Sequence, residues 1–105
     1  MSMRSQLLKI GQFHILNDAY NANPASMRCA LETLANLGPH GQKIAVLGDM
    51  LELGGPGQAA HREVGREVAR VGIKYLITMG PLAEQIAQGA LSAGMDEWRV
   101  IVLFQ

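Results

Sequence analysis

With 105 residues, the chain has the length of one domain with a single hydrophobic core. Hydrophobic residues make up 49% of it, which excludes intrinsic disorder. Nine Lys and Arg balance nine Asp and Glu, so no excess of positive charge predicts nucleic-acid binding. The single cysteine, Cys29, excludes an internal disulfide, and no uncharged stretch is long enough to span a bilayer. We therefore expect one cytoplasmic domain over residues 1–105 that binds neither nucleic acid nor membrane.

The first elements in chain order are a hairpin and a helix. Residues 13–16 are predicted to form a short strand, paired with residues 6–10. Asn23 and Pro24 are then of the types that favour the N-cap and the first position of a helix. Apolar residues recur at helical spacing from there until Gly38, where a Gly-Pro pair predicts that the helix ends.

Strands and helices continue to alternate in the second half of the chain. Residues 44–47 form a continuous apolar run, which is typical of a strand buried on both faces, and further strands are predicted at residues 75–79 and 100–104. Two helices are predicted between them, one from near Gln58 to Gly72 and one from Pro81 to just before Gly94. This order indicates right-handed βαβ units. We predict an α/β fold, Rossmann-like and three-layered, with a mostly parallel sheet and helices on both of its faces.

Ligands of open parallel sheets bind beyond the carboxyl ends of the strands. This rule selects three loops, residues 17–24, 48–57 and 80–81, of which the first two are densest in polar residues and glycine. The sequence contains no P-loop, and its three histidines lack the spacing of a zinc site. We therefore place function in the first two loops and predict no metal ligands.

The first of these loops, residues 17–24, has the sequence NDAYNANP. Asp18 ends a strand, where a carboxylate can accept hydrogen bonds from a ribose or a ligand ammonium. Asn21 and Asn23 offer amide donors beside a helix N-terminus, which attracts anions. Asn23 alone is expected only to cap the helix, but the whole set, with Tyr20, predicts a binding loop.

The second loop, residues 48–57, has the sequence GDMLELGGPG. Asp49 and Glu52 are close enough in sequence to bind an amine or to lie near a magnesium ion, although Glu52 equally fits a solvated position. His61 falls in the first turn of the next helix, on its inner face. A packing or capping role and a role toward the loop are both open for this histidine.

Three motifs together resemble the C-terminal domain of the Mur ligase family: NDAYNANPASM at 17–27, VLGDMLELG at 46–54 and HREVG at 61–65. The resemblance covers nearly the whole chain from Arg4 onward, and its nearest branch adds D-alanyl-D-alanine to the UDP-N-acetylmuramoyl tripeptide (UDP-MurNAc-tripeptide) of peptidoglycan synthesis. It implies an ATP-dependent amide-bond ligase that works through an acyl phosphate, with Mg²⁺ neutralising the phosphoryl charge. It also implies a separate central domain, which carries the P-loop and the metal ligands.

The resemblance implies two groups of binding residues on this chain. Five match the nucleotide side of the family's site: Arg4, Asp18, Tyr20, Asn21 and Asn23. Among them, Asp18 is implied to contact the ATP ribose and Arg4 to reach the nucleotide. Three match a loop that faces the dipeptide, with their individual roles left open: Asp49, Glu52 and His61. No catalytic residue is assigned.

The chain departs from the family pattern in a few places. Asn17 stands where many members have the first of two aspartates, no central domain precedes Arg4, and the chain stops at Gln105 before the family's Lys-Gly-Ser strand. We therefore expect a truncated piece of a ligase that is inactive alone and binds no cofactor tightly. Two alternatives stay open, a free-standing module that binds a nucleotide or other small ligand and a structural domain that has lost the site.

Overall fold

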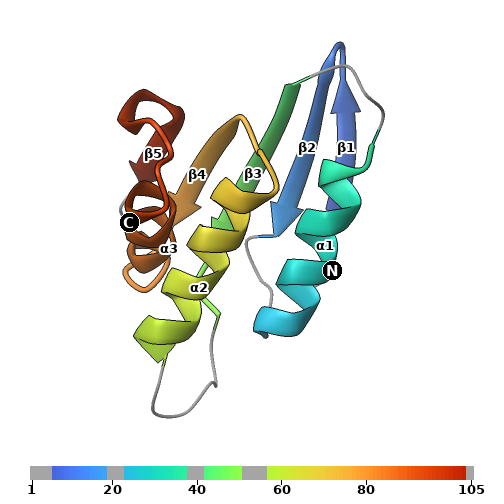
Figure 1. The fold of residues 1–105 in the computed structure, drawn as a ribbon. Coiled ribbons are helices and arrows are strands. Elements are labelled where there is room, and N and C mark those ends of the chain that lie inside the picture. Colours follow the sequence, from blue (N-terminus) through green and yellow to red (C-terminus); the bar gives the residue numbers. More distant parts are fainter. Residues whose placement is uncertain (1–5, 19–22, 38–41, 51–56, 104–105) are drawn as a thin grey trace.

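The computed structural model describes residues 6–18, 23–37, 42–50 and 57–103 (Figure 1). Its elements in chain order are β1 Gln6–Ile10, β2 Phe13–Asp18, α1 Pro24–Ala35, β3 Gln42–Gly48, α2 Gly57–Arg70, β4 Tyr75–Met79, α3 Glu84–Ser92, the short 3₁₀ helix η1 Glu97–Arg99, and β5 Val100–Leu103. The strands also follow chain order across the sheet. β1 pairs with β2 antiparallel, and β2 to β5 are parallel to one another. The predicted α/β class and mostly parallel sheet are confirmed.

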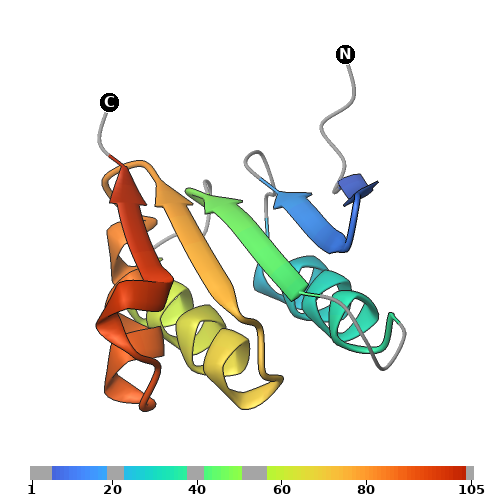
Figure 2. The same ribbon diagram turned by 90° about the horizontal axis from the view of Figure 1, so that it is seen from above.

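The three described helices all lie on one face of the sheet, as Figure 2 shows. The predicted arrangement, with helices on both faces and three layers, is therefore wrong for the part of the chain that the structure describes. The physical reason is the strand order. Right-handed crossovers place every helix on the same side when each parallel strand is added to the same edge of the sheet, and helices on both sides require a reversal of direction.

The hydrophobic core fills the space between this face of the sheet and the helices. Ala45 and Leu47 of β3 are fully buried, whereas the alternate residues Ile44 and Val46 keep partial exposure on the other face. The helices contribute fully buried side chains at helical spacing: Met27, Leu31 and Leu34 from α1, Val64 and Val68 from α2, and Ile86 and Ala90 from α3. The apolar helix faces expected from the sequence are the ones that form the core.

Helices α2 and α3 lie side by side and approach each other through two glycines (Figure 1). A Cβ atom built on Gly65 would lie 1.9 Å from the backbone oxygen of Ile86, and one built on Gly89 would lie 2.1 Å from that of Arg62. Any larger side chain at either position would collide with backbone. The two helices therefore form one tightly fixed pair, which carries the histidine of the candidate site.

Candidate functional site

Both loops predicted to carry function begin at the carboxyl edge of the parallel sheet. Asp18 is the last residue of β2, Asp49 directly follows β3, and the turn at Gly80 directly follows β4. The strand register places Asp18 beside Leu47, and Leu47 beside Thr78. The structure therefore brings Asp18, Asp49 and the β4–α3 turn to one edge of the sheet, as the sequence predicted.

Asp18 and Asn23 stand on either side of the segment that joins β2 to α1. Asp18 is buried, with 1% of its surface exposed, and faces the helical layer in the same row as Leu47. The Asn23 side chain accepts a hydrogen bond from the Ser26 backbone N–H at 2.8 Å, so its predicted capping role is confirmed. The first turn of α1 contains no acidic residue, so no carboxylate of the helix itself neutralises the positive end of the helix dipole.

Asp49 caps a helix that lies far from it in sequence. Its Oδ1 accepts a hydrogen bond at 2.6 Å from the backbone N–H of Ala83, the N-cap residue of α3, whose own side chain cannot cap. Gly80 makes the approach possible, because its φ is +119° and a Cβ there would lie 2.5 Å from Asp49 Oδ1. Sequence reasoning missed this pairing, although the Gly-Pro pair after β4 marked the turn. The Asp49 side chain thus joins the end of β3 to the start of α3.

His61 is fully buried, and both of its ring nitrogens bind backbone. Nε2 accepts a hydrogen bond from the Met50 N–H at 2.9 Å, and Nδ1 lies 2.5 Å from the carbonyl oxygen of Gly57. A backbone N–H can only donate, so Nε2 must be unprotonated, and the proton of the neutral ring is on Nδ1, which donates to Gly57. Of the two roles left open by the sequence, the geometry supports the structural one, directed at the residues that flank segment 51–56.

Four of the predicted site residues lie outside the described residues: Arg4, Tyr20, Asn21 and Glu52. The ligand contacts implied for them, and for the other four, remain predictions. Within the described ranges, no group of three His, Cys, Asp or Glu side chains is arranged to hold a metal ion. No helix in these same ranges is long and apolar enough to cross a membrane.

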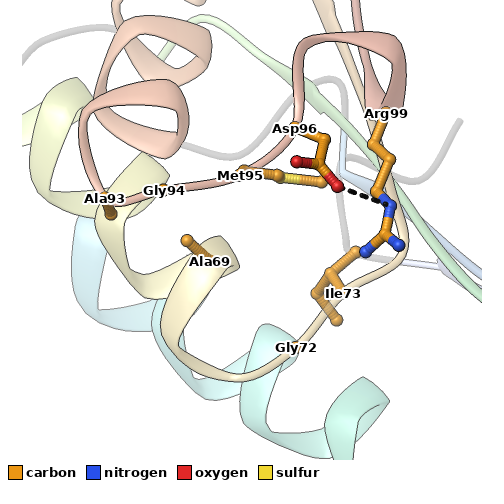
Figure 3. Close-up of a pocket in the computed structure, with 8 residues that line it drawn as sticks. All are labelled: Ala69, Gly72, Ile73, Ala93, Gly94, Met95, Asp96 and Arg99. Carbon is orange, nitrogen blue, oxygen red and sulfur yellow. Dashed lines mark ion pairs between the residues drawn. The ribbon is translucent and has the colours of Figure 1, made fainter.

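Two cavities in the described part of the chain differ in their position relative to the edge that holds Asp18 and Asp49. One, of about 180 Å³, is at the opposite edge, near the amino ends of β4 and β5, where Asp96 and Arg99 form an ion pair at 3.7 Å (Figure 3). The other, of about 600 Å³, is a wide, mostly apolar hollow between Leu7, Leu16 and one side of α1, and its lining includes Ser26, which donates to Asn23 at the start of that helix. Neither contains a residue of the predicted site.

The fold and the site together define an α/β domain whose polar residues gather at the carboxyl edge of a parallel sheet. Residues 3–104 match the family model for "Mur ligase, glutamate ligase domain", and the chain belongs to this family. The resemblance seen in the sequence motifs is thereby confirmed.

The relatives that the chain matches include ligases for D-alanyl-D-alanine. The UDP-N-acetylmuramoyl-tripeptide–D-alanyl-D-alanine ligase of Bacillus subtilis is 43% identical over 90 residues, which are 85% of this chain and 20% of that ligase. The ligase of the same name from Escherichia coli is 37% identical over 73 residues, 70% of this chain and 16% of that one. A crystal structure of MurF from Acinetobacter baumannii matches 95% of this chain and 21% of its own, with a TM-score of 0.72 and 29% identity. The chain therefore spans about one fifth of the length of the relatives it matches.

Proposed function

We propose that this chain is one domain of an ATP-dependent ligase that adds D-alanyl-D-alanine to a UDP-N-acetylmuramoyl tripeptide in peptidoglycan synthesis. One observation carries the proposal: the two loops that hold the motifs of this branch start at the edge of the sheet where α/β domains bind ligands. The ligases named for this reaction are also the relatives that this chain matches. Because ATP and UDP-linked precursors are its substrates, we place the reaction in the cytoplasm.

The nucleotide side of the proposed site is built around the start of α1. Asp18 is a carboxylate at the end of β2, suited to the hydroxyls of a ribose once nucleotide binding exposes its buried side chain. The N-terminus of α1, whose first turn holds no acidic residue, is suited to a phosphate group. Asn23 keeps this helix end in place by its capping bond. We assign the nucleotide side to Arg4, Asp18, Tyr20, Asn21 and Asn23.

ATP would activate the carboxylate of the tripeptide by phosphorylating it, and the dipeptide amine would then displace phosphate to form the amide. The family resemblance assigns the Mg²⁺ ligands to the central domain, where the metal would neutralise charge on the transferred phosphoryl group. What this domain supplies is one wall of each binding site. It positions the nucleotide and the dipeptide against a central domain, and it is therefore inactive alone.

The dipeptide side is assigned to Asp49, Glu52 and His61. Asp49 is the residue of this group best placed to meet a positively charged amine, because it directly follows β3 and is only partly buried. A carboxylate can accept about four hydrogen bonds, so the bond from Ala83 leaves capacity for a ligand ammonium. Its fixed position would reduce the entropy lost when the dipeptide binds.

The proposal is tested with a chimera in which this domain replaces the matching segment of the Bacillus subtilis ligase. We expect release of phosphate from ATP that depends on both D-alanyl-D-alanine and the tripeptide. An Asp18→Asn chimera is expected to show a raised KM for ATP and an unchanged KM for the dipeptide. A chimera that binds ATP but gives no product with D-alanyl-D-alanine, under conditions where the Bacillus subtilis ligase is active, would contradict the proposal.

A further inference from the structure

We infer that His61 is a positioning residue that holds Asp49 in place for the dipeptide. This assignment of a role within the dipeptide side rests on the proposed function. The hydrogen bond between His61 and its neighbour Met50 can be tested independently of any ligand.

The first step is the bond to Met50. The N–H that donates to His61 Nε2 belongs to the peptide group between Asp49 and Met50. Fixing this N–H fixes the plane of that peptide group, which includes the Asp49 carbonyl. His61 therefore holds the backbone of Asp49 from the side of α2. Removing the ring would leave the buried Met50, which is 1% exposed, with an N–H that has lost its acceptor.

The second step is the bond to the Asp49 side chain. Ala83 donates its N–H to Asp49 Oδ1 at 2.6 Å, at the start of α3. Asp49 is thus held twice, by α2 through its backbone and by α3 through its carboxylate. Helices α2 and α3 pack in close backbone contact at Gly65 and Gly89, so the two groups that hold Asp49 are fixed relative to each other.

The third step excludes direct chemistry by the ring. His61 has no exposed surface, and both nitrogens are engaged within the protein. A proton taken up at Nε2 would face the Met50 N–H, so that two donors would oppose each other. The ring therefore acts on a ligand only through the backbone that it fixes.

The two hydrogen bonds can be separated by substitution. In His61→Gln, the side-chain oxygen can reach the place of Nε2 and accept from Met50. In His61→Asn, the shorter amide can donate at the place of Nδ1 and keep only the bond to Gly57. The Gly57 carbonyl also accepts the regular i→i−4 hydrogen bond of the helix, so it keeps a partner when the ring is removed. The Met50 N–H, in contrast, loses the acceptor that the ring provides. The inference therefore predicts that His61→Gln retains the hydrogen bond to Met50 and the function of His61, whereas His61→Asn loses both.

The first measurement is hydrogen exchange of the Met50 amide in the 105-residue chain. Loss of one hydrogen bond should speed its exchange by about three- to tenfold in His61→Ala and His61→Asn. Exchange in His61→Gln should stay near that of the wild type. His14→Ala, which changes a histidine near the start of β2, serves as the matched control and should leave Met50 unaffected. If His61→Ala does not fold, the comparison of Gln with Asn decides alone.

The second measurement is kinetic and uses the active chimera. His61→Ala is expected to raise the KM for D-alanyl-D-alanine by about three- to tenfold, with the KM for ATP within twofold and kcat little changed. His61→Gln should restore the dipeptide KM. Unchanged dipeptide binding, equal losses for ATP and dipeptide, or rescue by Asn as complete as by Gln would each overturn the inference. An inactive wild-type chimera would instead count against the proposed function, while the exchange result would still test the bond to Met50.

Discussion

Substitution of Gly65 by alanine tests the helix pair on which the candidate site is built. The added Cβ would lie 1.9 Å from the Ile86 oxygen and 2.7 Å from the Ala90 nitrogen, and both atoms are backbone. The first distance is about 1.5 Å short of the 3.4 Å at which ordinary contact begins, so α2 and α3 must move apart. Forcing a methyl group into such a packed contact costs about 1–3 kcal/mol or more. The higher helix propensity of alanine offsets at most about 1 kcal/mol of this cost.

We therefore expect Gly65→Ala to lower the free energy of unfolding by about 2 kcal/mol, which lowers the Tm by roughly 10 °C in a domain of this size. Urea and thermal unfolding followed by circular dichroism would measure both values. The matched control is Gly57→Ala in the same helix, where a Cβ would meet nothing within 4 Å. That variant should be as stable as the wild type or slightly more stable. If both variants proved equally stable, the close approach of α2 and α3 would be refuted.

Three further substitutions test individual interactions. Asn23→Ala should cost about 1 kcal/mol in urea unfolding by removing the cap of α1, whereas Asn23→Asp should retain most of it; equal losses would argue against capping. Asp49→Ala should cost about 1–3 kcal/mol because the Ala83 N–H loses its acceptor, and Asp49→Asn should cost less; a neutral Asp49→Ala would exclude that bond. Arg70 donates to Glu67 and lowers the pKa of that carboxyl below its unfolded-state value near 4.5. The pair therefore stabilises the fold at pH values above about 4.5, and this stability is lost as the pH falls through the lower pKa of the folded state. Glu67→Gln should accordingly lose less stability than the wild type on acidification, and parallel pH curves would disprove the coupling.

The sequence predicted the elements wherever local chemistry determines them. Asn23 and Pro24 marked the start of α1 because a cap and the first helical position have their own residue preferences. The apolar run at 44–47 located β3, but the strand extends to Gln42, through pairing with β2, and to Gly48, through pairing with β4. The loops of the candidate site were found because strand ends could be located.

Features that depend on tertiary contacts could not be predicted in the same way. The third helix was expected from Pro81 but begins at Glu84, because its cap comes from Asp49, which lies 34 residues away from Ala83. The placement of all helices on one face depends on strand order, which hydrophobic periodicity does not encode. The two bonds of His61 likewise depend on where Met50 lies after folding.

The central claim is that the carboxyl edge of this sheet supplies one wall of a nucleotide site and one wall of a dipeptide site. The most direct measurement is an amide NMR titration of this chain, with magnesium-ADP and D-alanyl-D-alanine added separately. The account predicts weak binding of both, with the nucleotide shifting Asp18 and Asn23, and the dipeptide shifting Asp49, Met50 and His61. Tight nucleotide binding without any response to the dipeptide, or shifts centred on the cavity at Asp96 and Arg99, would contradict it.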